Sequence, residues 1–387
     1  MAAETIHDEL QALKEAALYR RLRRVESDQG PALMLDGREI INFSSNNYLG
    51  LANHPALCAS AKEAIDRYGC GSGASRLISG NMVLHEELEA KLAGFKGTEA
   101  AVVFNSGFQA NTGILSTLAG EGDVIFSDAL NHASIIDGCR LSRAKTVIYP
   151  HGDLAQLEAA LRQAAHSRRK LVVTESIFSM DGDEAPLKGI VELAEQYDAM
   201  VMVDEAHATG LFGANGAGVV AKLGLGDRVL VQMGTLGKAL GGFGAYVAGS
   251  SALRELLINR CRSFIFTTSL PPAVMAMAIA AIDLVRREPE RREALWTNCR
   301  SLTAGLRGLG FKMEATAGPI LPLIIGDAAE CMKFSEQLLE RGIFAQGIRP
   351  PTVPPGTSRL RITMMATHTR EQIDRALKAF EEARELA

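Results

Sequence analysis

Cysteine is scarce in this sequence, and the few cysteines stand far apart. The 387 residues include six of them: Cys58, Cys70, Cys139, Cys261, Cys299 and Cys331. None forms a Cys-x-x-Cys pair, so the sequence predicts neither a zinc site nor a disulfide framework. The first ten residues also lack the apolar segment of a signal peptide. We therefore expect a protein of the reducing cytoplasm that binds no metal.

Long apolar runs and strong net charge are absent too. The longest apolar helix candidate, residues 273–285, is interrupted by Asp283 and falls short of the ~18 residues that a membrane span requires. The formal net charge is only −4, so no basic field favours nucleic acid or an anionic membrane. With 47% hydrophobic and 22% charged residues, the composition is typical of a globular enzyme. We expect neither nucleic acid nor a membrane among its partners.

Short apolar runs alternate with helical patterns between residues 98 and 247. These runs are the strand candidates 100–104, 124–126, 145–148, 171–174, 200–203, 229–232 and 244–248. Such alternation predicts an α/β domain with a mainly parallel sheet. The 37 glycines of the chain suit the many tight turns of this architecture.

The two ends of the chain have different patterns. Helical spacing predicts a helix over residues 4–24, and Asp36-Gly37 predicts a β-hairpin. A helical stretch over 272–309, broken at Pro289, leads into a compact α+β unit. Its expected elements are strand 320–325, helix 328–341, strand 343–348, strand 358–364 and helix 369–386. The expected domains are an N-terminal helix and hairpin segment (1–45), a large domain (46–288) and a small C-terminal domain (289–387).

An acid and a lysine each follow one of the central strand candidates. Asp204 ends the apolar run 200–203, at the edge of the sheet where open α/β folds bind ligands. Lys238 follows the run 229–233 and lies among glycines, which leave space for a flat ligand. Alone, the acid could cap a helix and the lysine could be solvated. Together they predict a pyridoxal phosphate (PLP) site, with His207 close enough to reach the same pocket.

Three stretches carry a family resemblance. They are Asp204-Glu205-Ala206-His207, Gly234-Thr235-Leu236-Gly237-Lys238 and Ser176-Ile177-Phe178-Ser179-Met180-Asp181-Gly182-Asp183. With them the chain resembles the α-oxoamine synthase family from about Leu22 to Phe380. The resemblance implies the PLP-dependent transferase fold type I (aspartate-aminotransferase-like), with a large mainly parallel-sheet domain and a smaller C-terminal α+β domain. It also implies an acyltransferase that joins an amino acid to an acyl thioester with loss of CO2.

The resemblance assigns the reaction to three residues. Lys238 would hold PLP as a Schiff base and move the α-proton of the amino acid. Asp204 would keep the ring nitrogen protonated. His132 would stack on the ring and contact the carbonyl of the acyl substrate.

Further residues are expected to hold the cofactor. The turn Ser106-Gly107-Phe108 follows a strand and opens a helix, so the N–H groups of Gly107 and Phe108 can bind a phosphate. By resemblance, Thr235 also binds the phosphate, and Ser179 and His207 contact the phenolic oxygen. Thr267 and Thr268 resemble a segment that reaches the phosphate in the neighbouring subunit, which implies a homodimer.

The substrate residues also come from the resemblance. Arg349-Pro350-Pro351-Thr352-Val353-Pro354 resembles the branch of the family that condenses L-alanine with pimeloyl-CoA or pimeloyl-ACP in biotin biosynthesis. In this branch Thr352 would line the acyl channel. Arg20 would meet the far carboxylate of the pimeloyl group, with Arg23 as the alternative. Arg361, helped by Asn46, would clamp the amino acid carboxylate, and Arg349 is a second candidate for that role.

Two rival functions remain. A second branch of the family, 2-amino-3-ketobutyrate CoA ligase, uses glycine and acetyl-CoA, and the 349–354 stretch and Arg20 argue against it. A nicotinamide-dependent oxidoreductase would share the α/β pattern, and residues 69–73 are rich in glycine. That loop follows the expected helix 56–67 instead of a strand, which does not match a dinucleotide-binding fingerprint.

Overall fold

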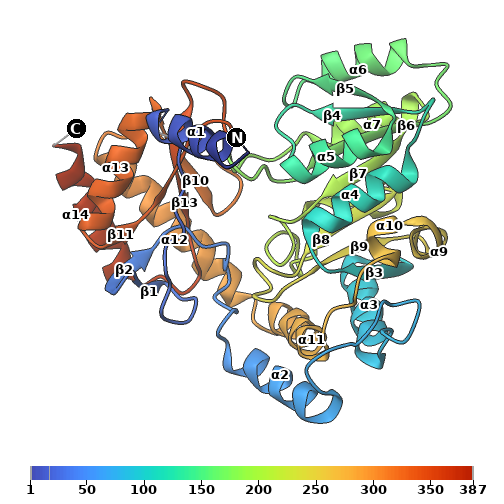
Figure 1. Ribbon diagram of the computed structural model, residues 1–387, viewed down its shortest axis with the longest axis horizontal. Helices are drawn as coiled ribbons and strands as arrows, with labels where there is room; N and C mark the ends of the chain where they lie inside the picture. Colours follow the sequence, from blue (N-terminus) through green and yellow to red (C-terminus); the bar gives the residue numbers. More distant parts are fainter. Residues whose placement is uncertain (1, 17, 386–387) are drawn as a thin grey trace. The chain divides into compact units, whose positions relative to one another are not determined.

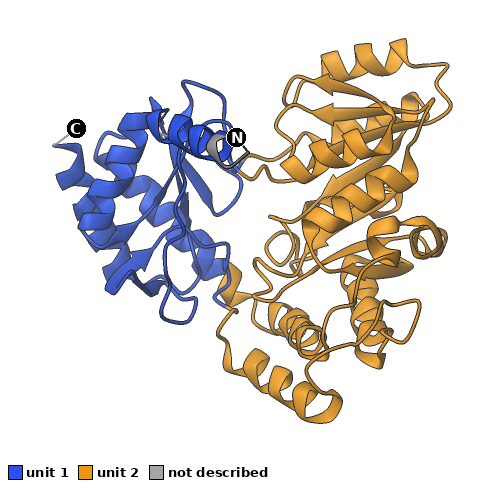
Figure 2. Ribbon diagram, in the orientation of Figure 1, with its two compact units in different colours: residues 1–50, 180–182, 293–387 blue, residues 51–179, 183–292 orange. Residues whose placement is uncertain are grey.

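The computed structural model describes residues 2–16 and 18–385. The chain divides into two compact units (Figure 2). Unit 1 comprises Met1–Gly50, Met180–Gly182 and Glu293–Ala387, and unit 2 comprises Leu51–Ser179 and Asp183–Arg292. The N-terminal and C-terminal segments therefore belong to one unit. The boundaries 1–45, 46–288 and 289–387 remain a sequence-based proposal.

Unit 2 contains a seven-stranded sheet with the strand order β3-β9-β8-β7-β6-β4-β5 (Figure 1). Its strands are β3 (Ala100–Phe104), β4 (Val124–Asp128), β5 (Lys145–Tyr149), β6 (Lys170–Glu175), β7 (Met200–Asp204), β8 (Val231–Thr235) and β9 (Ala245–Gly249). β9 runs antiparallel to both neighbours, and the other adjacent pairs are parallel. The expected mainly parallel sheet is confirmed.

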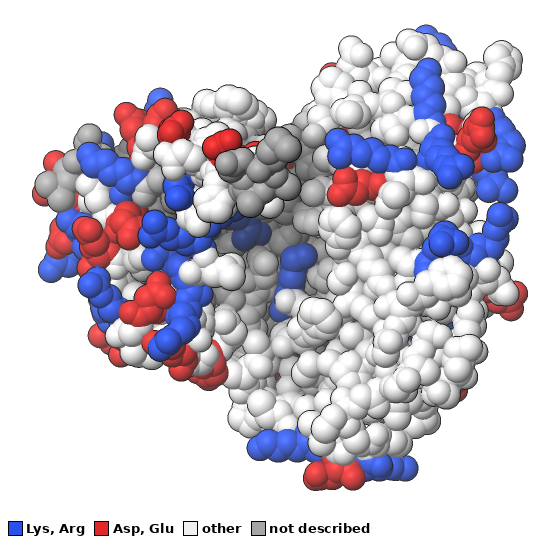
Figure 3. Space-filling view, viewed as in Figure 1, with Lys and Arg blue, Asp and Glu red and all other residues white. Residues whose placement is uncertain are grey.

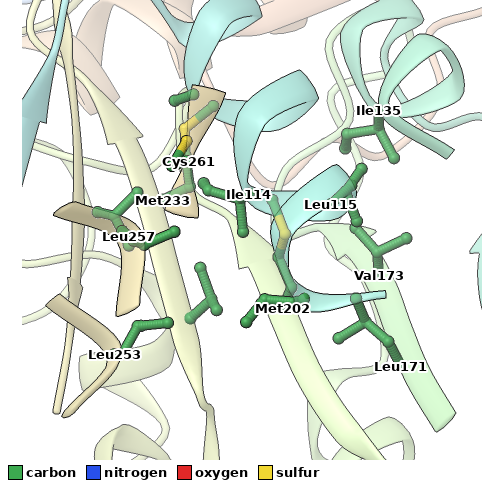
Figure 4. Packing of buried hydrophobic residues seen from close by; sticks show 14 of the residues in the cluster. Ile114, Leu115, Ile135, Leu171, Val173, Met202, Met233, Leu253, Leu257 and Cys261 are labelled. Carbon is green, nitrogen blue, oxygen red and sulfur yellow. The ribbon is translucent and has the colours of Figure 1, made fainter. Parts of the chain in front are cut away.

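Helices flank this sheet. They are α2 (Pro55–Tyr68), α3 (Val83–Lys96), α4 (Gly107–Leu118), α5 (Ala133–Ser142), α6 (Leu154–Gln163), α7 (Leu187–Gln196), α8 (Val219–Lys222), α9 (Ser251–Arg260), α10 (Arg262–Ile265) and α11 (Pro272–Arg287). Ile114 and Leu115 of α4 belong to one buried cluster with Met202 of β7 and Val173 of β6 (Figure 4). This packing fixes α4 against the strands that end in Glu175 and Asp204.

Unit 1 contains two three-stranded sheets. One has the order β1 (Ala32–Leu35), β2 (Arg38–Asn42), β11 (Ile343–Phe344), and the other β10 (Ile320–Gly326), β13 (Ser358–Thr363), β12 (Gln346–Ile348). Its helices are α1 (Ala2–Glu15), α13 (Ala328–Glu340), α14 (Arg370–Arg384) and nearly all of α12 (Glu290–Gly308). Asp36 and Gly37, with φ of 49° and 78°, form the predicted hairpin turn between β1 and β2.

The prediction of one strand over 343–348 is wrong, because the chain changes sheets there. β11 pairs with β2, and β12 pairs with β13. The hydroxyl of Ser44 donates to Phe344 O (3.1 Å) and accepts from Gln346 N (2.8 Å). The Ser44 hydroxyl thus supplies hydrogen bonds between β11 and β12, where the strand-to-strand hydrogen bonds are interrupted.

The predicted helix over 4–24 is too long. Helix α1 ends at Glu15; residue 17 lies outside the described residues, and residues 18–24 are not helical. The N–H groups of Leu18 and Tyr19 both bond to Leu13 O, which terminates the helix. Arg24 then pairs with Asp36 through Arg24 N to Asp36 Oδ1 (2.9 Å) and Asp36 N to Arg24 O (2.8 Å). Pairing with the hairpin thus overrides the helical propensity of this stretch.

Basic and acidic side chains are interspersed on the face of unit 1 shown in Figure 3. This face carries no field of one sign. Among residues 2–16 and 18–385, none of the helices combines the length and the apolar character that a membrane crossing requires.

Candidate active site

A cavity of about 160 Å³ in unit 2 brings together most of the residues predicted to bind the cofactor. It is lined by Gly107, Phe108, Asn111, His132, Ser134, Glu175, Asp204, Ala206, His207, Met233, Thr235 and Lys238. These residues come from the carboxyl ends of β6, β7 and β8, the loops that follow β7 and β8, and the amino ends of α4 and α5. Residues more than 130 positions apart in the sequence therefore share one site.

Asp204 is the last residue of β7 and is 4% exposed. Its Oδ2 accepts a hydrogen bond from Asn111 Nδ2 (2.8 Å), and its Oδ1 accepts one from Ala206 N (2.8 Å). Both donors stabilise negative charge on the carboxylate and fix its orientation.

Glu175 is a second buried carboxyl group in this cavity. It ends β6 and is the register partner of Asp204, so both side chains leave the same face of the sheet at adjacent strand ends. Burial, and then the charge of Asp204, raise the pKa of Glu175 well above its ordinary value. Its Oε1 is buried and has no hydrogen-bond partner within the described chain. Burial and the neighbouring carboxylate therefore favour the neutral form of Glu175.

His132 precedes α5 and caps it with its ring. Its Nδ1 accepts a hydrogen bond from Ser134 N (3.2 Å) and lies 2.7 Å from Ser134 Oγ. Burial lowers the pKa of His132, although the charge of Asp204 opposes this effect. The cavity thus holds a neutral imidazole close to a carboxylate and a lysine.

Lys238 lies half-buried in the loop between β8 and β9 and lines the same cavity. Gly107 opens α4 nearby, and a Cβ on it would lie 2.9 Å from Thr235 Cγ2, so only glycine fits without displacement. Ser106 caps the helix by accepting from Gln109 N (3.2 Å). The first N–H groups of α4, at Gly107 and Phe108, have no acceptor within the helix, and an exposed helix N-terminus of this kind suits an anion.

Three predicted residues do not line this cavity. Ser179 is buried beyond the end of β6. Thr267 and Thr268 contact Asn105, whose Nδ2 donates to Thr267 Oγ1 (3.1 Å) and Thr268 O (2.8 Å). Their expected roles, at the phenolic oxygen and in a neighbouring subunit, stay predictions.

Asn111, Ser134 and Glu175 line the cavity but were not among the residues predicted from the sequence. Glu175 had a usable signal, because it follows the apolar run 171–174 as Asp204 follows 200–203. Asn111 and Ser134 had none, since they reach the site only through the packing of α4 and α5. Within residues 2–16 and 18–385, no group of three His, Cys, Asp or Glu side chains could hold a metal ion.

A larger pocket, of about 630 Å³, lies in unit 1 and is rich in arginine. It is lined by Tyr19, Arg20, Arg21, Leu22, Arg23, Asp36, Met332, Glu336, Gln346, Gly347, Ile348, Arg349 and Thr352. Arg23 pairs with Glu336 (2.9 Å) and Asp36 (3.7 Å). Burial, and then the like charge of Arg20, lower the pKa of Arg349. The pocket therefore concentrates positive charge that its own acids only partly neutralise.

Arg361 lies elsewhere in unit 1, on β13, and is buried. Its two terminal nitrogens both donate to Asn46 Oδ1 at 3.3 Å, and Tyr48 Oη donates to the same oxygen at 3.0 Å. Arg359 is also buried and pairs with Asp181. The alternation of Arg359 and Arg361 is thus no solvated strand edge.

Comparisons with known proteins agree with this fold and site. The model of the family "Aminotransferase class I and II" matches residues 38–380. A relative from Geotalea daltonii, 8-amino-7-oxononanoate synthase, is 53% identical over 379 residues, which cover 97% of this chain and 96% of the relative. A solved structure of SPT with PLP superposes with a TM-score of 0.94 at 36% identity, covering 99% of this chain and 97% of that one.

The solved 8-amino-7-oxononanoate synthase of Francisella tularensis gives a TM-score of 0.78 at 29% identity, covering 90% of this chain and 98% of that one. The expected aspartate-aminotransferase-like fold is therefore confirmed. By its sequence over residues 38–380 and by its fold, the chain belongs to the aminotransferase class I and II family.

Proposed function

We propose that the protein catalyses the PLP-dependent condensation of L-alanine with a pimeloyl thioester, with release of CO2 and of the thiol carrier. This is the reaction of the 8-amino-7-oxononanoate synthases in biotin biosynthesis, and the carrier is CoA or ACP. The observation that carries the proposal is the single cavity that Asp204, His132 and Lys238 share with the amino end of α4. The names of the relatives at about half identity over nearly the whole chain support it.

The cavity fits PLP at each of the cofactor's polar groups. The free N–H groups at Gly107 and Phe108, with the hydroxyl of Thr235, suit the phosphate. The buried carboxylate of Asp204 suits the ring nitrogen, and the amine of Lys238 suits the aldehyde. When bound, PLP supplies an electron sink for negative charge at the α-carbon of the amino acid.

Each side chain of the cavity has its own role in the reaction. The Lys238 amine removes the α-proton of alanine and later returns a proton, because it is held beside that carbon. Asp204 holds a proton on the ring nitrogen, and neutral Glu175 does not compete with it for that proton. His132 would cover the ring face and meet the acyl carbonyl, and His207 would contact the phenolic oxygen, a role also proposed for Ser179 outside the cavity lining.

Unit 1 recognises the carboxylates of the substrates. Arg361 and Asn46 clamp the carboxylate of alanine, which suits the paired nitrogens of a guanidinium. Arg20 binds the far carboxylate of the pimeloyl chain, and Thr352 lines the same pocket, as does Arg349, the second candidate for the carboxylate of alanine. Arg23 is less suited to this role, because Glu336 and Asp36 already neutralise it. An acetyl group has no far carboxylate, so this pocket argues against the glycine and acetyl-CoA reaction.

We further propose a cytoplasmic homodimer. Thr267 and Thr268 would then reach the phosphate in the partner subunit. In support, unit 2 exposes large apolar side chains, with Ile78 at 80% and Phe266 at 70%. Where such side chains form one contiguous patch, they mark a contact site between proteins.

The purified enzyme tests the proposed function in a crossed assay of L-alanine against glycine and pimeloyl-CoA against acetyl-CoA. We expect turnover only with alanine and pimeloyl-CoA, or with pimeloyl-ACP as carrier. Preference for glycine with acetyl-CoA would assign the protein to the 2-amino-3-ketobutyrate ligases. A nicotinamide-dependent oxidoreductase would lack the visible absorption band of PLP.

A further inference from the structure

We propose that Asn111 and Ser134 are positioning residues that lock His132 in the tautomer with its proton on Nε2 and couple that choice to Asp204. The inference rests on the proposed function for its catalytic meaning, but its geometry stands independently. Asn111, Ser134 and Asp204 are each at most 4% exposed, so water does not replace their hydrogen bonds.

The chain of hydrogen bonds begins at Asp204. Asn111 Nδ2 donates to Asp204 Oδ2 (2.8 Å), and it also donates to Ser134 Oγ (2.9 Å). The opposite orientation of the amide would place Asn111 Oδ1 against the carboxylate, where two acceptors repel each other. Asp204 therefore fixes the amide so that Nδ2 faces both partners.

Ser134 links the fixed amide of Asn111 to the ring of His132. Because Ser134 Oγ accepts from Asn111, its own hydrogen is available for His132 Nδ1, 2.7 Å away. The backbone N–H of Ser134 donates to the same ring nitrogen at 3.2 Å. A proton on Nδ1 would face the fixed backbone N–H of Ser134 and would leave the hydroxyl no acceptor on the ring, so Nδ1 accepts and Nε2 carries the proton.

The tautomer of His132 determines whether its ring can donate a hydrogen bond to a substrate in the cavity. The neutral ring presents Nε2–H as a hydrogen-bond donor to a carbonyl oxygen of the acyl substrate. Loss of either relay residue frees the ring to adopt the tautomer with its proton on Nδ1, which has no proton on Nε2 to donate. Asn111 and Ser134 act through His132 and Asp204 in this account.

The test measures 15N shifts of the ring nitrogens in histidine-labelled holoenzyme, with His132 assigned from the spectrum of His132→Gln. In the wild type we expect Nδ1 unprotonated and Nε2 protonated through neutral pH. In Ser134→Ala we expect mixed tautomers, a raised pKa of His132, and a kcat lowered about tenfold, as for one lost buried hydrogen bond. KM for alanine should change by less than about twofold, since that substrate does not contact the relay.

Ser142→Ala is the matched control, because Ser142 is a buried serine on the same helix α5 that bonds only to backbone groups. It should leave the shifts of His132 unchanged. Protonated Nδ1 in the wild type overturns the inference without any variant. Unchanged shifts in a folded Ser134→Ala also overturn it. The expected tautomer in a protein inactive towards alanine and pimeloyl-CoA would retain the relay and reject the proposed function instead.

Discussion

The cavity around Lys238 and the arginine pocket differ in volume and in how their side chains are held. The cavity around Lys238 in unit 2 is small, and its charged and polar groups are buried and fixed by hydrogen bonds. The arginine pocket in unit 1 is about 630 Å³ in volume, and Arg20 on its wall is exposed. Bond making and breaking requires groups that stay in place, whereas a flexible acyl chain requires mainly space and charge.

We expect single changes in the Lys238 cavity mainly to lower kcat, and changes in the arginine pocket mainly to weaken substrate binding. In the first case the removed group acts in the transition state, and in the second it binds substrate and transition state alike.

The largest effect is expected for Lys238→Ala. Because this amine both holds PLP and moves the proton, turnover should fall by roughly 10⁴-fold. The absorption band of the lysine-bound cofactor should disappear, which a visible spectrum would detect. Lys222→Ala serves as control, since Lys222 is a surface lysine of unit 2 paired with Glu184. An unchanged spectrum in Lys238→Ala would remove the lysine from the mechanism.

Asp204→Asn should have the next largest effect. An amide at this position no longer favours a proton on the ring nitrogen, so exchange of the α-proton of alanine should slow by about 10²–10³-fold. PLP affinity should change far less, because the phosphate site at α4 remains. Exchange followed by NMR and PLP titration would separate the two quantities. Equal losses in both would refute the electron-sink role, and the exposed Asp227→Asn is the control.

A moderate effect is expected for Arg20→Ala. Loss of one charge-assisted hydrogen bond should raise KM for pimeloyl-CoA about tenfold, with KM for alanine unchanged. Arg23→Ala is the matched comparison, because Arg23 lines the same pocket but is paired with Glu336 and Asp36. If Arg23→Ala raises the KM for pimeloyl-CoA and Arg20→Ala does not, the roles of the two arginines are reversed.

The smallest effect concerns His151, which follows β5 in unit 2 and lies outside the lining of the Lys238 cavity. Hydrogen bonds to Asp128 and Asp183, both 2.9 Å, raise the pKa of His151 to about 10. The stability from this charge is complete below the unfolded pKa of about 6.5 and is lost as pH rises through about 10.

His151→Gln should therefore lower Tm by about 2 °C at pH 6, and the difference from wild type should vanish near pH 10. Thermal melts across this range would measure it, with the exposed His166→Gln as control. A difference in Tm that does not depend on pH would show that His151 contributes packing and no charge.

The Lys238 cavity was largely predictable because its residues follow strands. Strand ends can be located from short apolar runs, and parallel strands bring their carboxyl ends to one edge, so Asp204 and Lys238 could be associated from the sequence pattern, and the family resemblance added Thr235. Asn111 and Ser134 were not predicted, because the packing of α4 and α5 places them near Asp204 and no local sequence pattern indicates it.

The arginine pocket was harder to predict. Arg20 and Arg349 are 329 positions apart, and the position in the sequence favours Arg20 without excluding Arg23. The distinction comes from acids on distant elements, Asp36 after β1 and Glu336 on α13. The prediction of a helix over 4–24 was wrong for the same reason. The carboxylate of Asp36 accepts a hydrogen bond from Arg24 N, and this contact holds Arg24 in a non-helical conformation.

The most direct measurement reduces the holoenzyme with borohydride and maps the labelled peptide by mass spectrometry. The account predicts a phosphopyridoxyl group on Lys238 and on no other lysine. A label on a different residue, or no label on a protein that has bound PLP, would contradict it.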